Sequence, residues 1–400
     1  MLTHSNFAEE VKRLARTEGF DLAGVAPVRE FTELAYFPAW VDAGYAGEME
    51  YLKRRDDTGA FKRASLESVA PWVQSVVVCA INYNPGEPYS TQVKDAERGW
   101  ISRYAWSRED YHDSVLRRLR AVESQLVEQV ERGRQDAATT AGKMPALQKH
   151  SGSDANEITG VSAIQTRCYV DTGPLVERVY AKYAGVGWIG KNTCILNQKM
   201  GSWLFLGVIL TSLELTPDMP APDRCGTCTR CLEACPTEAF LGPYQLDSNK
   251  CISYLTIEKR GSIPKDLREG IGRHVFGCDI CQDVCPWNRK APTTALPEFQ
   301  PRPGLVNPAL DWLAEMQAEE FREVFRGSPI RRTKLSGIRR NAVIALGNSG
   351  NQDFLPTLQK LSSDPDPIVA ESAQWACGQL QKAEAGKKHR PPASQHIEIE

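Results

Sequence analysis

Eight of the twelve cysteines in this chain occur at spacings that could bind metal. The first motif reads C-x2-C-x2-C-x3-C-P, and the second reads C-x2-C-x3-C-P and follows a single upstream cysteine. In the first motif, three thiolates contact one face of an iron–sulfur cubane, whereas the fourth points away to another cluster. Eight thiolates in this pattern predict two [4Fe-4S] clusters with four ligands each.

Because the motifs cross, each cluster takes one ligand from the other motif. One predicted set of ligands is Cys225, Cys228, Cys231 and Cys285. The other predicted set is Cys235, Cys251, Cys278 and Cys281. Structural zinc is the alternative, but zinc sites usually pair two C-x2-C knuckles. Ligation alone does not fix the direction of electron flow, because cluster potentials span roughly −700 to +450 mV.

Composition and charge are those of an ordinary globular protein. The chain has 400 residues, of which 42% are hydrophobic and 24% charged, and its net charge is −2. No stretch approaches the roughly 20 apolar residues of a membrane helix, and the N-terminus shows no secretory or twin-arginine export signal. We therefore expect a cytoplasmic monomer, with no contact to a membrane, whose cysteines stay reduced. The four cysteines outside the two sets are expected to fill buried positions: Cys79, Cys168, Cys194 and Cys377.

Hydrophobic periodicity predicts both helices and strands in the first half of the chain. Helices are expected over 5–18 and 111–131 and from Pro174, and strands over 21–26, 76–83, 194–196 and 203–211. This mixture predicts an α/β or α+β domain over residues 1–220. Within it, the stretch 133–165, which is rich in Ala, Thr, Gly, Ser, Gln and Lys, is predicted to be a disordered insertion.

The second half begins with the cysteine module, which we place at residues 221–291. Prolines then mark a linker. Three small residues, Ala342, Ala345 and Gly347, recur 31 residues later as Ala373, Ala376 and Gly378. This repeat predicts HEAT-like α-helical hairpins over residues 292–383, followed by a disordered tail over 384–400. The expected fold class is therefore α+β with several domains.

A glycine motif, Gly185-Val-Gly187-Trp-Ile-Gly190, has the spacing of a dinucleotide fingerprint. That fingerprint needs a strand before it and a helix after it. Here a helical pattern precedes the glycines and strand-like residues follow them, so we reject NAD or FAD binding. The glycines are instead expected to end a helix and to let the backbone approach a flat ligand.

Further motifs link the cysteine module to the rest of the chain. They are Arg103-Tyr-Ala-Trp, Asp110-Tyr-His112, Tyr169-Val-Asp171-Thr-Gly-Pro174, Ala184-Gly-Val-Gly-Trp-Ile-Gly-Lys-Asn192 and Cys278-Asp-Ile-Cys-Gln-Asp-Val-Cys-Pro-Trp-Asn288. With these motifs the chain resembles the epoxyqueuosine reductases over roughly residues 5–380, apart from the insertion. The resemblance implies an α/β cobalamin-binding domain, a bacterial ferredoxin-like two-cluster module and helical HEAT-like repeats. It also implies that the epoxide of epoxyqueuosine, at the wobble position of tRNA, is reduced to queuosine.

The resemblance assigns Asp171 as the proton donor. Opening an epoxide leaves an alkoxide, and a carboxylic acid that burial keeps protonated could protonate it. The alternative is that Asp171 caps the helix that opens at Pro174. His112 likewise has two interpretations, as a substrate contact or as a hydrogen-bonded structural histidine.

The resemblance also implies contacts to cobalamin, and the alternative for several of them is an ordinary core or loop residue. The implied contacts are Arg63, Ser102, Asp171, Ile195, Leu206, Ser253 and Asp279. Some relatives have a cysteine at the position of Ser102, so an obligatory thiol is not expected there. The D-x-H-x-x-G box that ligates cobalt in other proteins is absent, because Val115 stands where its glycine is needed. No protein histidine therefore need occupy the lower face of the corrin.

The stretch 322–340 carries seven basic residues and one acid, Glu323. Such an excess of positive charge attracts phosphate, although a solvated helix face is the alternative. The resemblance implies that this region contacts the tRNA anticodon stem-loop through Arg332, Lys334 and Arg340. Electrons are expected from an external low-potential donor, through the clusters, to cobalamin.

Three other functions fit parts of this pattern. A cobalamin-dependent reductive dehalogenase would share the cofactors, but the missing export signal and the basic C-terminal stretch argue against it. A ferredoxin-like electron carrier would not need the large N-terminal domain. A non-catalytic tRNA-binding scaffold would be opposed if the loss of Asp171 abolished activity and left RNA binding intact.

Overall fold

The computed structural model describes residues 4–86, 88–141 and 164–388, so most of the predicted insertion and tail lie outside the described residues. The central feature of the first half is a four-stranded antiparallel sheet in the order β1-β2-β7-β4. Its strands are β1 (Leu22–Pro27), β2 (Ser75–Asn82), β7 (Leu204–Thr211) and β4 (Thr166–Tyr169). In the described ranges, no helix combines the length and the apolar character that crossing a membrane requires.

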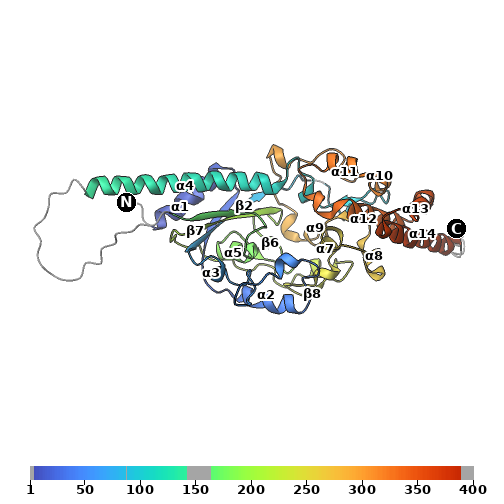
Figure 1. The fold of residues 1–400 in the computed structure, drawn as a ribbon, viewed down its shortest axis with the longest axis horizontal. Helices are drawn as coiled ribbons and strands as arrows, with labels where there is room; N and C mark the ends of the chain where they lie inside the picture. The colour runs from blue at the N-terminus through green and yellow to red at the C-terminus, as the bar shows by residue number, and fades with distance from the viewer. Residues whose placement is uncertain (1–3, 87, 142–163, 389–400) are drawn as a thin grey trace, which may run out of the picture.

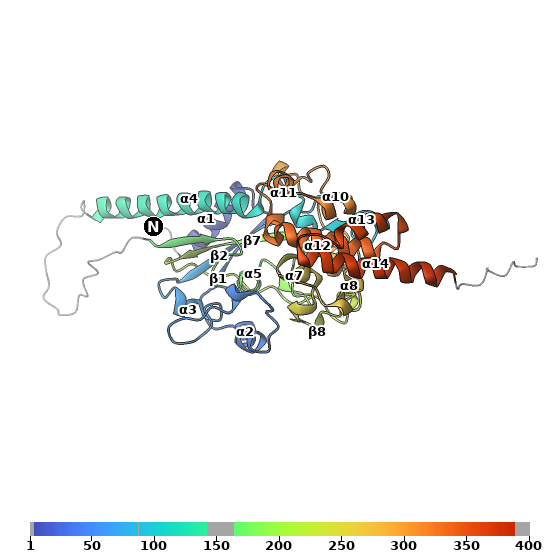
Figure 2. The same cartoon turned by 45° about the vertical axis from the view of Figure 1, so that its right-hand side comes forward.

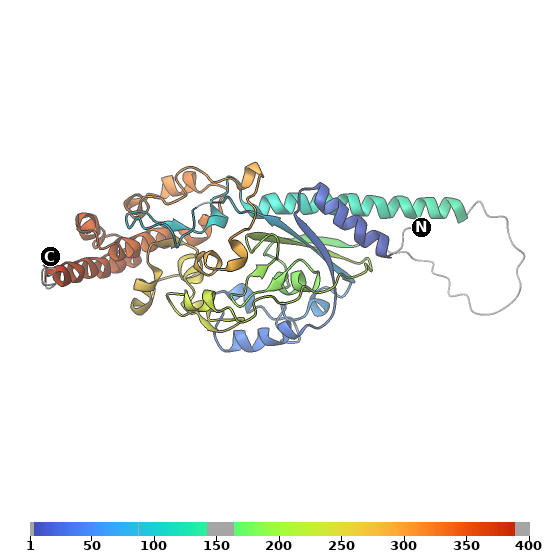
Figure 3. The same ribbon diagram turned by 180° about the vertical axis from the view of Figure 1, so that it is seen from behind.

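Helices cover both faces of this sheet (Figure 1 and Figure 3). They are α1 (His4–Thr17) and α4 (Tyr111–Ala141) on one face and α5 (Glu177–Tyr183) on the other. Strand β2 is buried along its whole length, and its side chains alternate between the faces. Val77 and Ile81 pack towards α1 and α4, whereas Val76 and Val78 pack towards α5. Burial on both faces explains why this part of the sequence is apolar throughout.

Shorter elements complete the chain. In the first half they are α2 (Thr32–Asp42), α3 (Leu66–Val69), β3 (Trp100–Ile101), β5 (Trp188–Ile189) and β6 (Ile195–Leu196). The cysteine module contains α6 (Arg230–Glu233), β8 (Phe240–Gly242), β9 (Gln245–Leu246), α7 (Ile252–Ile257), α8 (Lys265–Ile271), β10 (His274–Phe276) and α9 (Ile280–Asp283). The C-terminal helices are α10 (Leu310–Glu315), α11 (Ala318–Val324), α12 (Lys334–Asn348), α13 (Leu355–Leu361) and α14 (Pro367–Lys388).

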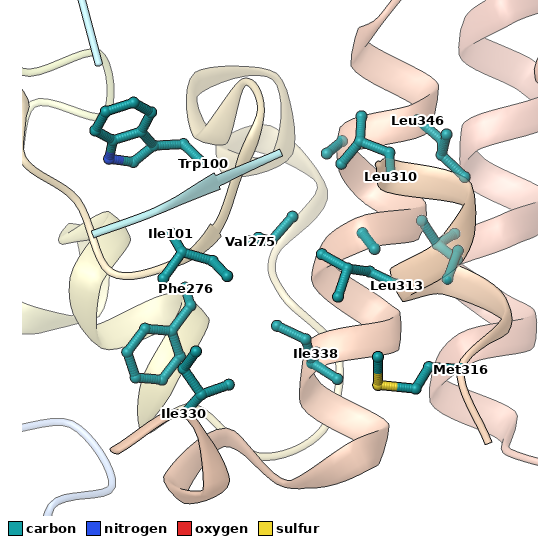
Figure 4. Packing of buried hydrophobic residues seen from close by; sticks show 14 of the residues in the cluster. Trp100, Ile101, Val275, Phe276, Leu310, Leu313, Met316, Ile330, Ile338 and Leu346 are labelled. Atoms are coloured by element: carbon teal, nitrogen blue, oxygen red, sulfur yellow. The ribbon is translucent and has the colours of Figure 1, made fainter. Parts of the chain in front are cut away.

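The C-terminal helices form an apolar core together with segments from both earlier parts of the chain. Strand β3 from the first half pairs in parallel with β10 from the cysteine module. Figure 4 shows Ile101 and Phe276 of these strands close to Ile338 of α12, with Leu313 of α10 nearby. The division of the chain at residues 220 and 291 stays a prediction, and this packing crosses both positions.

Helices α12 and α14 carry the two copies of the small-residue repeat, and they lie side by side (Figure 2). A Cβ added at Gly347 of α12 would lie 2.7 Å from the Cβ of Ala376 of α14. The repeat therefore occurs where two helices approach closely, which only small residues allow. The α-helical C-terminal region expected from the sequence is confirmed.

For the two segments predicted to be disordered, the predicted starts are wrong. Helix α4 continues to Ala141, so the predicted disorder does not begin at residue 133. Residues 134–141 contain alanine, arginine and glutamine, which favour helix, and neither proline nor glycine. Helix α14 likewise continues to Lys388, past the expected start of the tail at residue 384, through a stretch that includes glutamate, alanine and lysine.

The glycine motif has the reversed context expected from the sequence, because α5 precedes it and β5 follows it. Gly185 adopts a positive φ of 71° directly after α5, as a helix-ending glycine does. The start of α5 was predicted incorrectly. The helix begins at Glu177 and not at Pro174, because Val176 before it is extended.

Candidate active site

Asp171 lies just after β4, where the chain turns towards α5. Its backbone is in the left-handed region (φ 57°), which costs a residue other than glycine about 1–3 kcal/mol. Its carboxylate accepts a hydrogen bond from the phenol of Tyr111, the first residue of α4. The alternative that Asp171 caps a helix is wrong, because α5 begins only at Glu177 with Val176 at its N-cap.

Tyr111 is a fixed hydrogen-bond donor to this acid. Burial raises the pKa of Tyr111 well above its usual value, and the charge of Asp171 raises it further, so the phenol keeps its proton. Its ring stacks on Phe205 of β7, with the ring centroids 4.2 Å apart. Tyr111 belongs to the Asp110-Tyr-His112 motif, but the sequence alone gives it no role, because its pairing with Asp171 joins positions 60 residues apart.

His112 lies between two carboxylates. Its Nδ1 is 2.8 Å from Oδ1 of Asp110, and its Nε2 is 3.9 Å from Oδ2 of Asp171. The contact with Asp110 favours the structural interpretation of His112, whereas Nε2 faces the proposed acid. The Asp171 side chain is 50% exposed. The burial that we expected around this acid is therefore not supplied by the protein alone.

Arg63 fixes the loop that carries Asp171. Its Nη1 donates a hydrogen bond to the carbonyl of Leu175 at 3.1 Å, and its Nη2 donates to the carbonyl of Asp171 at 3.4 Å. Its Nη1 also lies 4.0 Å from Oε2 of Glu177. Of the residues predicted to contact cobalamin, Arg63 and Asp171 are thus brought together at one loop.

Glu177 has a buried carboxylate oxygen, Oε1, that lacks a hydrogen-bond partner among the described residues. Burial raises the pKa of Glu177 to about 7, and the charge of Asp171 contributes. A buried acceptor of this kind is costly unless a ligand supplies a donor. The corrin ring of cobalamin carries amide side chains whose N–H groups are such donors, so the residues here fit that cofactor. The sequence gives no sign of a role for Glu177, because its nearest cation, Arg63, is more than a hundred residues away in the chain.

The Glu177→Gln variant is expected to gain stability relative to the wild-type protein as pH rises. In the folded wild-type protein the pKa of Glu177 is about 7, above its ordinary value of 4.5. The folded state therefore binds this proton more tightly than the unfolded state does, and the wild-type protein loses stability as pH rises from 4.5 to 7. The full difference, reached above about pH 7, corresponds to about 3 kcal/mol. Urea unfolding of the cobalamin-free protein across this pH range measures it. A stability difference that stays constant with pH would contradict a buried, ionisable Glu177.

Near the loop that carries Asp171, side chains from segments far apart in the sequence meet at the ring of Tyr51. The guanidinium carbons of Arg63 and Arg332 lie 5.8 Å and 5.2 Å from the centroid of its ring. Nε of Arg332 also forms an ion pair with Oε1 of Glu258 at 2.5 Å. Burial raises the pKa of Tyr51, and the charges of Glu258 and Asp171 add to this shift. Arg332, predicted to contact tRNA, therefore lies on the same tyrosine ring as Arg63, which holds the loop of Asp171.

Ser102 and Asp279 are only 3% and 1% exposed, and the serine hydroxyl is hydrogen-bonded to the carboxylate. The second carboxylate oxygen accepts hydrogen bonds from the indole of Trp100 and the backbone N–H of Arg103, both at 2.9 Å. Both polar groups thus join the β3 segment to the second cysteine motif, and their contact with cobalamin stays a prediction. The sequence could not reveal this pairing, because the two residues are 177 positions apart.

The remaining predicted cobalamin contacts lie in packed or half-buried positions. Ile195 is buried and Leu206 half-buried in the core between the sheet and α5, which agrees with the alternative of ordinary core residues. Ser253 is half-buried on α7, two residues after Cys251. Contact between these residues and cobalamin stays a prediction.

The first predicted cysteine set converges in the structure. Burial raises the pKa of Cys231 to about 11, and the neighbouring thiols of Cys225 and Cys228 contribute. Burial also raises the pKa of Cys285 to about 11, with contributions from Cys231 and Cys225. A cysteine of the second motif, Cys285, therefore lies near Cys225 and Cys231 of the first, as the crossed arrangement expects.

The second set converges in the same way. Burial raises the pKa of Cys278 well above its usual value, and nearby Cys251 and Cys235 raise it further. The nearby thiols of Cys278 and Cys251 likewise raise the pKa of Cys281. These neighbours agree with the crossed arrangement of two [4Fe-4S] clusters, and the assignment of each thiol to one cluster stays a prediction.

The other four cysteines only partly match the prediction that they fill buried positions. Cys79 is buried in β2, whereas Cys168, Cys194 and Cys377 are half-buried. Cys194 lies beside Cys281, a predicted cluster ligand. The sequence did not indicate this position, since Cys194 is outside both motifs.

Arg340 is 1% exposed and does not reach the surface of the basic stretch. Its guanidinium donates hydrogen bonds to the backbone carbonyls of Leu255, Lys259 and Gly261, at and just beyond the end of α7. The prediction that Arg340 contacts tRNA is therefore wrong, because the side chain is used to satisfy carbonyls at a helix C-terminus.

Other members of the basic stretch are exposed. Arg331 and Arg332 are exposed just before α12, and Lys334 is exposed as its first residue. Arg339 instead forms an ion pair with Asp364 at 2.5 Å. Arg322 and Arg326 are exposed as well. The basic residues of the stretch that remain available for phosphate are thus Arg322, Arg326, Arg331, Arg332 and Lys334.

Three family models match parts of the chain. A model described as "4Fe-4S double cluster binding domain" matches residues 224–288, and one described as "HEAT repeats" matches residues 333–388. A model described as "Epoxyqueuosine reductase QueG, DUF1730" matches residues 63–140. These matches coincide with the cysteine module, with the last helices, and with β2 to α4.

Curated relatives match nearly the whole chain. The chain is 38% identical to the epoxyqueuosine reductase of Pseudomonas aeruginosa over 378 residues, which cover 93% of this chain and 94% of the relative. It is 39% identical to that of Synechocystis over 324 residues, which cover 80% of this chain and 98% of the relative.

Solved structures agree with the curated relatives. A selenomethionine-labelled epoxyqueuosine reductase matches with a TM-score of 0.77 and 30% identity, covering 96% of this chain and 95% of that chain. An epoxyqueuosine reductase with an epoxyqueuosine-modified tRNA-Tyr stem loop matches with a TM-score of 0.76 and 30% identity, covering 97% and 94%.

Proposed function

The chain belongs to the epoxyqueuosine reductase family, and we propose that Asp171 is the proton donor of its reaction. The protein is an oxidoreductase that reduces the epoxide of epoxyqueuosine in tRNA to the alkene of queuosine. Its cofactors are two [4Fe-4S] clusters and cobalamin. The observation that carries this function is the 38% identity to an epoxyqueuosine reductase along 93% of the chain. Relatives that match at this length do not favour a dehalogenase or a separate electron carrier.

Converting an epoxide to an alkene consumes two electrons and two protons and releases the oxygen as water. Cobalamin, when bound, supplies a reduced cobalt centre that can donate electrons to an epoxide carbon. The protein must therefore supply protons where the epoxide oxygen develops negative charge, which is the task of a general acid.

The surroundings of Asp171 support this role. Arg63 fixes the backbone of its loop, and the phenol of Tyr111 orients the carboxyl group. After proton transfer, the same phenol stabilises the carboxylate by donating a hydrogen bond to it. Nε2 of His112, at 3.9 Å, is close enough to return a proton to Asp171 after a small movement, while Asp110 orients the imidazole ring.

The proposed reaction is tested by anaerobic reconstitution with iron, sulfide and cobalamin. The reconstituted protein is given a low-potential reductant and tRNA from a strain that accumulates epoxyqueuosine. Nucleoside analysis is expected to show loss of epoxyqueuosine and an equal gain of queuosine. If a fully loaded protein forms no queuosine, the proposed function is wrong.

We also propose how the chain binds its cofactor and its RNA. Arg63 and Glu177 are suited to bind amide side chains at the corrin rim, since Oε1 of Glu177 has no hydrogen-bond partner within the part of the chain that the structure describes. The exposed cations Arg331, Arg332 and Lys334 are suited to bind phosphates of the stem-loop. Arg332 shares the Tyr51 ring with Arg63, which holds the loop of Asp171. A wobble nucleotide that leaves its stack would then lie between the bound backbone and Asp171.

The variants Arg331→Ala and Lys334→Ala are expected to weaken stem-loop binding and to reduce its salt dependence. Each lost phosphate contact should lower the slope of log K against log[salt] by about 0.7–0.9. Fluorescence anisotropy with a labelled stem-loop at several salt concentrations measures both effects. Arg13→Ala, which removes an exposed cation from α1, is the control and should leave the slope unchanged. Equal slopes in all four proteins would exclude these residues from phosphate binding.

Four further features belong to this proposal. Electrons come from an external low-potential donor, and the protein acts as a monomer in the cytoplasm, where its tRNA substrate is found. The catalytic domain comprises residues 1–220 and the two-cluster module 221–291. The tRNA-binding helical domain begins at residue 292 and includes α14, which ends at Lys388. Size-exclusion chromatography with light scattering tests the monomeric state.

A further inference from the structure

The turn between β5 and β6 carries the end of the glycine motif that does not bind a dinucleotide. A Cβ added at Gly187 would lie 2.4 Å from the carbonyl oxygen of Leu196, and one at Gly190 would lie 2.5 Å from Cδ1 of the same leucine. These glycines therefore let the two strands of a tight hairpin approach each other. The glycines were expected to let the backbone approach a flat ligand. In the structure, the close approach that they allow is between the two strands of the hairpin.

This hairpin packs directly on the cysteine module. Trp188 and Leu196 form a small apolar core with Cys285, a predicted ligand of the first cluster. The indole rings of Trp188 and Trp287 meet edge to face, with centroids 5.1 Å apart. The turn at the tip of the hairpin is thus fixed against the loops that carry the cluster ligands.

Two side chains of this turn each contact one ligand loop. Nζ of Lys191 donates hydrogen bonds to the carbonyls of Gly226 at 2.7 Å and Cys228 at 3.0 Å, in the loop of the first cluster. Asn192 is 4% exposed, and its Nδ2 donates to the carbonyl of Cys281, in the loop of the second cluster, at 3.3 Å. Oδ1 of Asn192 accepts a hydrogen bond from the backbone N–H of Cys194, which fixes the amide.

We infer that Lys191 raises the reduction potential of the cluster ligated by Cys225, Cys228, Cys231 and Cys285. The inference rests on the two clusters of the proposed function. Reduction by a one-electron donor converts a [4Fe-4S] cluster from the 2+ to the 1+ state, which adds one negative charge and no proton. An ammonium group held beside the ligand loop stabilises the reduced state more than the oxidised state. Lys191 is therefore a positioning residue that sets the potential at which the first cluster accepts electrons.

The same loop contains a charge of opposite sign. Oδ1 of Asp223 accepts a hydrogen bond from the backbone N–H of Cys225 at 2.7 Å. Its negative charge opposes reduction, whereas that of Lys191 favours it. The pair provides two substitutions whose electrostatic effects must differ in direction.

The test is a potentiometric titration of the anaerobically reconstituted protein, monitored by electron paramagnetic resonance. At a fixed solution potential, Lys191→Met should lower the ratio of reduced to oxidised first cluster by about tenfold, equivalent to about 59 mV for one electron. Lys191→Arg should titrate like the wild-type protein, and Asp223→Asn should shift the ratio in the opposite direction. The Cys225→Ser variant identifies which of the two titration steps belongs to this cluster.

Iron and sulfide content is measured first. A wild-type protein without clusters would refute the proposed function, whereas loaded variants with unchanged potentials would refute only this inference. Shifts in the same direction for Lys191→Met and Asp223→Asn would show a disturbed loop and also overturn it. If Lys191→Met does not load, Lys191→Gln is used as a second neutral variant. Failure of both to load would assign Lys191 to assembly and not to the potential.

Discussion

Replacing Asp171 by asparagine is expected to lower the rate of queuosine formation by about 10²–10⁴-fold, the usual contribution of a positioned general acid. Asparagine has nearly the same volume, tolerates a φ of 57° and can still accept the hydrogen bond from Tyr111. It cannot release a proton. The variant therefore separates the loss of the acid from the loss of local structure, and queuosine formed in a single anaerobic turnover measures the effect.

Asp110→Asn is the matched control for this experiment. Asp110 orients the ring of His112, with Nδ1 and Oδ1 2.8 Å apart, and so acts on the reaction only through the histidine. Its replacement should cost less than that of Asp171, and both variants should bind the stem-loop with wild-type affinity. An Asp171→Asn rate within tenfold of the wild-type rate would show that another group supplies the proton.

The cysteine module is the part of the site that the sequence predicts best. Ligand spacing within each motif is local along the chain, and thiolates at those spacings favour one kind of cofactor. Even the crossing of the motifs follows from that chemistry, and the structure places Cys285 beside Cys231 and Cys235 beside Cys278. The buried strand β2 is similarly predictable, because burial on both faces requires a continuous apolar run.

Roles that depend on contacts between distant segments could not be predicted. Ser102 and Asp279 carry no local sign that each is the partner of the other. Lys191 likewise gives no sign in the sequence that its ammonium group contacts the loop of Cys228. Glu177 could equally have been an exposed helix residue. In each case the fold supplies the partner, so the residue type alone leaves the role open.

Arg340 is the clearest example, and we expect Arg340→Met to lower the free energy of unfolding by about 3 kcal/mol or more. Its guanidinium donates hydrogen bonds to the backbone carbonyls of Leu255, Lys259 and Gly261. Burial lowers the pKa of Arg340 to about 10. Methionine fills similar space but donates no hydrogen bond, so the carbonyls lose their partners at a cost of about 1–3 kcal/mol each. Urea unfolding of the cluster-loaded protein measures the change.

The matched control is Arg331→Met, which makes the same substitution at an exposed position of the same basic stretch. The two variants should show opposite behaviour. Arg331→Met should keep nearly wild-type stability and lose stem-loop affinity with a smaller salt slope, because exposed substitutions rarely change stability. Arg340→Met should lose stability, while its folded fraction binds the stem-loop with the wild-type salt slope. Arg340→Met could instead keep its stability and show a salt slope of stem-loop binding that is smaller by one phosphate contact. The guanidinium would then face the RNA, and the assignment of Arg340 to the end of α7 would be wrong.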